Sequence, residues 1–191
     1  SAGSGRNGGT VLLAWSICPT LERASKGSPM DTISLAAATI LTGLSAGLLY
    51  GWRVSVIPET RRTSSHAYVE TMQAINRAIL NPAFFLVFLG APVAIAVATV
   101  VSFVDDANAR AGLLAFAFVL YLTTTVVTTA VGNIPLNDQL EAFDVSGATS
   151  DEINAARVGY EHPWDRWHDV RTVSSASAFV LCVLAASVDV S

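Results

Sequence analysis

Four long runs of apolar residues, each without a charged side chain, divide the sequence into helix-length segments. These uncharged runs cover residues 32–52, 78–104, 111–137 and 172–188. A helix needs about 20 predominantly apolar residues, within a range of about 17–25, to cross the hydrocarbon layer of a bilayer. The pattern therefore predicts a polytopic membrane protein with spans at about 32–52, 83–104, 111–133 and 170–188.

A helix of a different kind is predicted between the first two spans. Apolar side chains recur there at intervals of three and four residues, at Tyr68, Met72, Ile75 and Ile79. This spacing places them on one face of a helix, and Ser64 or Ser65 can cap its start. We expect an amphipathic helix that lies at the membrane interface or caps the bundle.

The last two connections complete the predicted architecture. The short polar segment between Asp105 and Arg110 makes spans two and three antiparallel neighbours. Because proline is favoured at the first position of a helix, Pro163 predicts the start of a helix about 39 Å long, whose second half is span four. The predicted fold class is all-α: an integral membrane four-helix bundle with an additional amphipathic helix between spans one and two.

Residues 1–29 differ in character from the rest of the chain. The opening segment SAGSGRNGG resembles a flexible linker, and the apolar stretch at residues 11–18 is too short to cross a membrane. Met30 directly precedes the first span and is a natural position for an initiator. We expect residues 1–29 to be an N-terminal extension, flexible or not native, and residues 30–191 to form the four-helix domain.

The charge of the chain is low and unevenly placed. Charged residues make up 14% of the sequence, against about 25% in a typical soluble domain. The 11 basic residues are scattered over a chain of net charge −4, which excludes the basic stripe of a nucleic-acid-binding protein. The loops after spans one and three hold seven arginines, so the positive-inside rule places these loops in the cytoplasm and both termini outside. We expect a multi-pass protein of the bacterial plasma membrane.

Gly43, Gly47 and Gly51 form a stripe of small residues on the first span. A spacing of four residues puts all three on one helix face, where another helix can approach closely. The partner helix belongs to the same chain or to a second subunit, so a homo-oligomer through this face is one expectation. A non-catalytic assembly or accessory protein is therefore one reading of the function. A small transporter is less favoured, because the apolar runs contain no charged residue.

Two polar clusters border the last two spans. Asn133 and Asn137 share one face if span three stays helical through Pro135. The helix that enters span four places two aromatic rings, a titratable group and a cation on one face, at Trp164, Trp167, His168 and Arg171. Since spans three and four are consecutive, both clusters lie at the same membrane face and are expected to meet at the mouth of the bundle.

These clusters also have a purely structural interpretation. Tryptophans at a membrane boundary form an interfacial belt, and arginines there extend to the lipid headgroups. Arg171 can alternatively pair with an acid such as Asp138 across the spans.

A metal or cofactor site finds little support in the sequence. Cys18 and Cys182 form neither a zinc-binding pair nor a disulfide framework, and no glycine-rich phosphate-binding motif is present. Four possible metal ligands crowd one or two helical turns, but they form neither His-x-x-x-His nor His-Glu-x-x-His: His162, Asp165, His168 and Asp169. We therefore expect no metal and no cofactor.

The order of these features resembles the anthrone-oxygenase-like family of small four-span membrane proteins. The matching parts are the glycine-rich first span, Met-Gln-Ala-Ile-Asn at 72–76 with Asn-Pro at 81–82, Asn-x-Pro-Leu-Asn at 133–137, and Trp-x-x-Trp-His-x-x-Arg at 164–171. The resemblance extends over about residues 31–188. It implies an integral membrane oxidoreductase, a cofactor-free monooxygenase that oxidises a hydrophobic anthrone-type substrate to an anthraquinone, although many members of the family have no assigned function.

The resemblance also implies roles for the polar clusters. An anthrone that loses a proton becomes an electron-rich enolate, which reduces dioxygen directly without flavin or metal. His168 is then the base. Arg171 and two amides donate to the enolate oxygen, while two aromatic rings stack on the substrate. These amides and rings belong to Asn133, Asn137, Trp164 and Trp167. The expected partners are the lipid bilayer and a hydrophobic aromatic small molecule.

Overall fold

Helices make up nearly all of the chain that the structure describes. The computed structural model describes residues 28–188, and this part of the chain contains no strand. The helices are α1 (Pro29–Gly51), α2 (Ile57–Thr60), α3 (Ser65–Ala78), α4 (Pro82–Val104), α5 (Asn108–Tyr121), α6 (Ile134–Glu141) and α7 (Ser150–Ala186). The predicted all-α fold class is confirmed.

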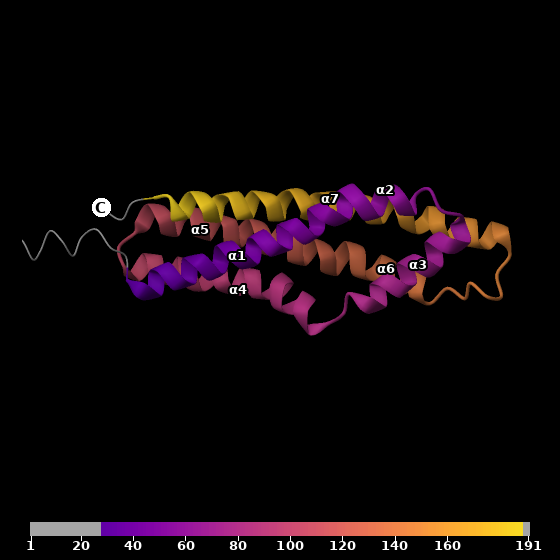
Figure 1. The fold of residues 1–191 in the computed structure, drawn as a ribbon, viewed down its shortest axis with the longest axis horizontal. Helices are drawn as coiled ribbons and strands as arrows, with labels where there is room; N and C mark the ends of the chain where they lie inside the picture. Colours follow the sequence, from indigo (N-terminus) through magenta and orange to yellow (C-terminus); the bar gives the residue numbers. More distant parts are fainter. Residues whose placement is uncertain (1–27, 189–191) are drawn as a thin grey trace, which may run out of the picture.

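Within residues 28–188, four helical stretches are long and apolar enough to cross a membrane: Pro29–Thr60, Pro82–Val104, Asn108–Glu141 and Ser150–Ala186. In the bundle, α1 packs against α4 and α7, and α5 packs against the same two helices (Figure 1). Small side chains such as Ala38, Ala91, Ala117 and Ala178 fill its core, which lets the helices approach closely. The chain therefore has the architecture of a multi-pass membrane protein, as predicted.

Three π-helical segments join neighbouring helices without a break. Trp52–Val56 links α1 to α2, whereas Leu122–Val127 and Thr129–Asn133 link α5 to α6. The helix therefore persists through Pro135, which is the condition for Asn133 and Asn137 to share a face. Turns of this kind are rare and are found frequently at functional sites. Each of the three segments supplies a residue to the cavity described below.

The helix start predicted at Pro163 is wrong. α7 continues through Pro163 and begins at Ser150, so it has 37 residues and a length of about 55 Å. A capping box starts the helix instead: the backbone N–H of Glu152 donates to the Thr149 hydroxyl, and the backbone N–H of Thr149 donates to the Glu152 carboxylate. This signal lies 14 residues before the proline and outweighs it.

Contacts with α3 and with the segment before it hold α7 on both sides of Pro163. The Arg157 guanidinium donates to the carbonyl oxygen of Thr63 at 2.8 Å, and Arg61 pairs with Asp165 at 2.5 Å. Tyr68 lies beneath Arg157, 4.5 Å from its ring centroid to the guanidinium carbon, and burial raises the pKa of its phenol. These contacts offset the backbone hydrogen bond that a proline removes from a helix interior.

The predicted amphipathic helix is α3. It begins after Ser64, whose hydroxyl accepts from the backbone N–H of Ala67 at 3.3 Å. Tyr68 and Met72 of its apolar stripe are buried in a second apolar cluster that α2, α3, α6 and α7 share. In Figure 1 this helix lies beside α6 and α7 beyond the start of α4. α3 therefore covers one end of the bundle.

A buried ion pair ties the helices together at the opposite end. The hairpin at residues 105–107 makes α4 and α5 antiparallel neighbours, as predicted. Arg110 donates to the Asp31 carboxylate and to the carbonyl oxygen of Ala185 at 3.1 Å. The Ser102 hydroxyl donates to the other Asp31 oxygen at 3.0 Å. This network connects α1, α4, α5 and the C-terminal turn of α7.

The glycine stripe of α1 is divided between an internal contact and open surface. A methyl group at Gly43 would lie 3.0 Å from the ring of Phe179, so this glycine lets α7 approach within the same chain. Nothing within the described residues lies within 4 Å of the corresponding positions at Gly47 and Gly51. The predicted contact with a second subunit stays a prediction.

The N-terminal extension falls largely outside the described residues. Ser28 and Pro29 are the part of it that the structure describes, and Pro29 is the first residue of α1. The Ser28 hydroxyl caps this helix by accepting from the backbone N–H of Asp31 at 3.1 Å. The helix therefore begins one residue before the predicted domain boundary at Met30.

Candidate functional site

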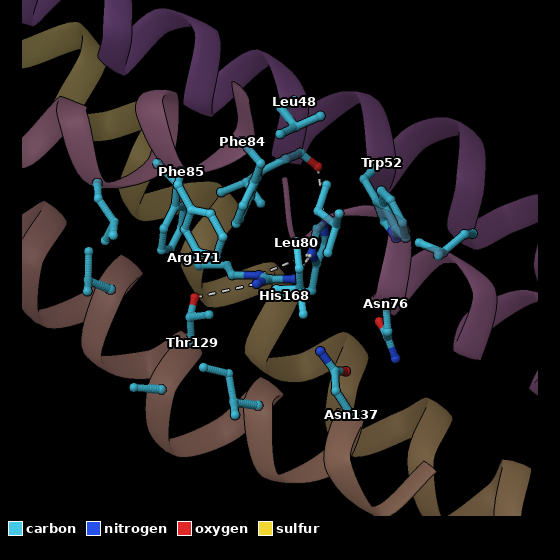
Figure 2. Close-up of a pocket in the computed structure, with 18 of the residues that line it drawn as sticks. Leu48, Trp52, Asn76, Leu80, Phe84, Phe85, Thr129, Asn137, His168 and Arg171 are labelled. Carbon is cyan, nitrogen blue, oxygen red and sulfur yellow. Dashed lines mark hydrogen bonds between the residues drawn. The ribbon is translucent and has the colours of Figure 1, made fainter. Parts of the chain in front are cut away.

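A cavity of about 280 Å³ lies where the four-helix bundle meets α3 and α6 (Figure 2). Apolar side chains make up most of its walls, among them Leu49, Ile79, Phe84 and Phe88. A small polar set also lines it: Asn76, Thr129, Asn137, His168 and Arg171. A mostly apolar cavity with a few convergent polar groups is typical of a small-molecule site, although the volume is near the lower end of the usual range of about 300–1,000 Å³.

Arg171 is a buried cation that makes no ion pair within residues 28–188. Its Nε and Nη2 donate to Nδ1 of His168 at 3.3 and 3.0 Å, and its Nη1 donates to the Thr129 hydroxyl at 3.4 Å. The guanidinium carbon lies 5.1 Å from the ring centroid of Trp164, within the range of a cation–π contact. The predicted pairing of Arg171 with the exposed Asp138 is therefore wrong.

His168 is buried and holds both of its ring nitrogens in hydrogen bonds. Because a guanidinium can only donate, Nδ1 is the acceptor for Arg171, and Nε2 carries the proton. Nε2 then donates to the carbonyl oxygen of Leu49 on α1 at 3.1 Å. The imidazole also stacks on Trp164, with ring centroids 5.0 Å apart. The geometry therefore assigns a neutral imidazole that orients the guanidinium.

The two asparagines that flank Pro135 both face α7, as the shared face predicts. Asn137 lines the cavity, and its Oδ1 accepts from the indole N–H of Trp164 at 2.8 Å and from the Tyr160 hydroxyl at 2.9 Å. Asn133 is buried beside the cavity and donates to the carbonyl oxygen of Trp164 at 3.3 Å. Its side chain does not line the cavity, so its predicted contact with a substrate stays a prediction.

The two tryptophans of the second cluster differ in their surroundings. Trp164 is buried in the cavity wall, so it does not belong to an interfacial belt. Trp167 is 39% exposed and packs on Gly132, where an added methyl group would come within 2.5 Å of its ring. Trp167 does not line the cavity. The stacking of either ring on a substrate stays a prediction.

The residues weighed as metal ligands do not gather around one point. Within the described part of the chain, no group of three or more His, Cys, Asp or Glu side chains is arranged to hold a metal ion. Asp165 pairs with Arg61 at 2.5 Å, and Asp169 pairs with Arg53 at 2.5 Å. Both carboxylates are therefore engaged with arginines outside the cavity lining.

Several lining residues were missed by the sequence analysis. Phe84 and Phe88 lie one helical turn apart and stack with centroids 5.1 Å apart, a spacing that the sequence displays but that does not separate a cavity wall from a lipid-facing surface. Trp52 ends the first uncharged run, and its buried indole N–H has no partner within residues 28–188. Asn76 follows Ile75 of the amphipathic stripe and is the last residue of the Met-Gln-Ala-Ile-Asn segment in the family resemblance, and these two signals were available for it.

Together these observations define a class of protein: a multi-pass helical membrane protein with a largely apolar cavity that buries an arginine against neutral acceptors. The model of the anthrone oxygenase family matches residues 84–181, just over half of the chain. The chain belongs to the anthrone oxygenase family, which confirms the resemblance found in the sequence. The matched region includes both polar motifs, at 133–137 and 164–171. Neither the curated proteins nor the solved structures contain a match to the chain.

Proposed function

We propose that this protein binds a flat, hydrophobic anthrone-type compound in the cavity and promotes its oxygenation by dioxygen. The observation that carries this proposal is the state of Arg171. A buried charge is ordinarily paired or bound to a ligand, because its removal from water costs several kcal/mol. Within the described residues the guanidinium has only neutral acceptors, so an oxygen that becomes negatively charged is the ligand that best completes its surroundings.

Arg171 has donors to spare for such an oxygen. A guanidinium carries five N–H groups, and the bonds to His168 and Thr129 use three of them. The two that remain are held on a side chain that borders the cavity. Donors that are already oriented in a dry site stabilise developing charge far better than donors in water. Arg171 is therefore the proposed donor to the enolate oxygen.

The proposed reaction balances with dioxygen as the only co-substrate. The methylene group of the anthrone loses a proton, and the resulting enolate transfers electrons to dioxygen and forms a carbon–oxygen bond. The peroxide so formed eliminates water to give the ketone. One oxygen atom thus becomes the new carbonyl oxygen, and the other leaves as water with the two methylene hydrogens. The enolate supplies the electrons, so this chemistry needs no cofactor.

His168 is the proposed base, on one condition that the geometry sets. Its Nδ1 lone pair is occupied by Arg171, and a proton placed there would face the guanidinium. We propose that the substrate oxygen replaces Nδ1 as the acceptor for Arg171, which frees the lone pair to take the methylene proton. The imidazolium that forms then lies beside the enolate that Arg171 also stabilises. His168 and Arg171 therefore act as one unit.

Oxygen uptake with a simple anthrone tests this proposal. We expect purified protein in detergent to consume oxygen above the non-enzymatic background, with one dioxygen per quinone formed. Arg171→Gln should lower the turnover by roughly 10²–10³-fold, as the loss of one oxyanion donor does. Arg62→Gln is the matched control, because Arg62 is exposed and pairs with Glu59 away from the cavity.

Two outcomes contradict the proposal. Folded wild-type protein without excess uptake removes the anthrone reaction and leaves the non-catalytic assembly role, which the open surface at Gly47 and Gly51 favours. Full turnover in Arg171→Gln removes the guanidinium from the mechanism.

We also propose that the protein lies in a bacterial plasma membrane with its arginine-bearing loops in the cytoplasm. The positive-inside rule supports this orientation of the loops.

A further inference from the structure

One wall of the cavity carries a chain of hydrogen bonds that links α3, α6 and α7. The indole N–H of Trp164 donates to Oδ1 of Asn137 at 2.8 Å. The Tyr160 hydroxyl donates to the same oxygen at 2.9 Å, and Nδ2 of Asn76 donates to the Tyr160 oxygen at 3.4 Å. Both asparagines line the cavity, whereas the tyrosine lies behind them.

The donors in this chain fix the orientation of both amides. An indole nitrogen only donates, so the atom that faces Trp164 must be the amide oxygen of Asn137. The single hydroxyl hydrogen of Tyr160 goes to that oxygen. The Tyr160 oxygen can then only accept from Asn76, which must present its nitrogen. Each step follows from chemistry that leaves no second orientation open.

The orientation leaves one donor and one acceptor turned toward the cavity. They are Nδ2 of Asn137 and Oδ1 of Asn76, and within residues 28–188 neither of these atoms makes a hydrogen bond. Figure 2 shows the nitrogen of Asn137 and the oxygen of Asn76 on the sides of their amides that face the middle of the cavity. Both amides contact the same Tyr160 oxygen, so the two free atoms lie only one amide group away from it.

We propose that Asn76 and Asn137 form a subsite for a hydroxyl group on the aromatic ring of the substrate. A hydroxyl donates to the oxygen of Asn76 and accepts from the nitrogen of Asn137, so one group satisfies both. A carbonyl or ether oxygen satisfies only the donor, and an unsubstituted ring leaves both amide atoms without a partner in an apolar cavity, which costs free energy. This inference rests on the proposed function for the aromatic nature of the ligand.

The hydroxyl subsite is separate from the proposed enolate site. Asn137 binds the nitrogen edge of the Trp164 side chain, whereas the Arg171 guanidinium lies 5.1 Å from the centroid of that ring. The two polar groups therefore contact different parts of the Trp164 side chain, its nitrogen edge and its ring face. A ligand that reaches both sites carries its hydroxyl on a ring position remote from the reacting carbonyl.

Binding of two quinones tests the subsite without any turnover. The probes are anthraquinone and a monohydroxylated anthraquinone whose hydroxyl is too far from the carbonyl to bond it internally. Their dissociation constants are measured by quenching of tryptophan fluorescence in lipid nanodiscs. We expect wild-type protein to bind the hydroxylated compound about 10-fold more tightly, as one or two net hydrogen bonds provide.

Two variants decide whether Asn76 provides this preference. Asn76→Leu removes the acceptor and leaves the bonds of Asn137 to Tyr160 and Trp164 in place, so only the donor of Asn137 remains for the hydroxyl and the preference should fall to about 3-fold. Asn154→Leu is the matched control, because Asn154 is exposed on α7 and bonds Ser65 away from the cavity. It should keep the wild-type preference.

Each result separates the subsite from the reaction. Equal binding of the two quinones by wild-type protein overturns the subsite, as does binding of neither quinone or an undiminished preference in Asn76→Leu. Oxygen uptake with unsubstituted anthrone reports on the reaction alone, since that compound has no hydroxyl. Uptake without preference overturns only the subsite, and preference without uptake overturns only the proposed reaction.

Discussion

Two arginines are buried in the described part of the chain, Arg110 and Arg171, and they are predicted to respond oppositely when leucine replaces them. Arg110 donates to the buried Asp31 carboxylate and to the carbonyl oxygen of Ala185. Arg171 donates only to the neutral acceptors of His168 and Thr129 within the described residues. One cation is thus compensated by an opposite charge, and the other is not.

The sizes of the two effects follow from what each substitution leaves behind. Arg110→Leu leaves Asp31 buried, with the Ser102 hydroxyl as its one remaining side-chain partner among residues 28–188. Breaking a buried ion pair in this way costs about 3–5 kcal/mol. For a chain of this size the apparent Tm should fall by about 10 °C. Arg171→Leu leaves Nδ1 of His168 unsatisfied, at about 1–3 kcal/mol.

The loss at His168 is offset because Arg171→Leu also removes a buried, uncompensated charge. The desolvation of such an ion costs several kcal/mol, so the two terms largely cancel. We expect the Tm of this variant to stay within about 5 °C of wild type while turnover falls by at least roughly 10²-fold. An unchanged Tm with a lowered turnover would mean that Arg171 serves the reaction and does not stabilise the fold.

Thermal unfolding in one detergent, followed by size-exclusion chromatography of heated samples, measures both variants. The double variant Asp31→Leu/Arg110→Leu serves as a control, since it removes both charges and should recover part of the stability lost in Arg110→Leu. The reasoning is refuted if Arg171→Leu loses as much stability as Arg110→Leu. Arg171 would then be structural, and the proposed function would lose the observation that carries it.

Two further predictions concern His168, which contacts Arg171, and Gly132, which lies in the π-helical segment Thr129–Asn133. His168→Ala should lower turnover, measured by oxygen uptake, by roughly 10²–10⁴-fold if the imidazole is the base. His168→Gln keeps an acceptor for the guanidinium but cannot act as the base. Wild-type turnover in the Gln variant would therefore limit the role of His168 to orienting Arg171. Gly132→Ala places a methyl group 2.5–2.8 Å from the inner atoms of the Trp167 ring and should destabilise by about 1–3 kcal/mol. A methyl group at Gly47 has no neighbour within 4 Å among the described residues, so Gly47→Ala should leave the Tm unchanged. Equal melting curves for the two alanine variants would contradict the packing of Gly132 on Trp167.

The bundle was predictable because the bilayer imposes a length on every apolar run. The second span was expected at residues 83–104, and α4 covers Pro82–Val104. Local signals near polar residues were harder to weigh. Pro163 and the Thr149–Glu152 capping box both indicate a helix start, and the sequence does not display the contacts of Arg157 that let the helix continue through the proline.

The residues that form the candidate site were more predictable from the sequence than the contacts that they make. The spacing of Trp164, His168 and Arg171 places them on one helix face, and the structure brings all three to the cavity. One alternative paired Arg171 with an acid such as Asp138 across the spans, whereas its acceptors in the structure are the neutral side chains of His168 and Thr129. One acceptor of the guanidinium is the hydroxyl of Thr129, which lies in a π-helical segment. A change of helical pitch shifts the register of a face, and no periodicity in the sequence reveals it.

The position of the cavity explains how the fold tolerates it. One apolar cluster is built by α1, α4, α5 and α7, and a second by α2, α3, α6 and α7. The cavity lies between the first cluster and the second, and α7 contributes to both. It therefore does not interrupt the packing inside either cluster. Phe84→Leu therefore enlarges the cavity, because the Phe84 ring is part of a wall that faces the cavity on one side. Its main expected cost is lost contact with a ligand, whereas the same change at Phe88, which is buried against Tyr121, also opens the first cluster and lowers stability.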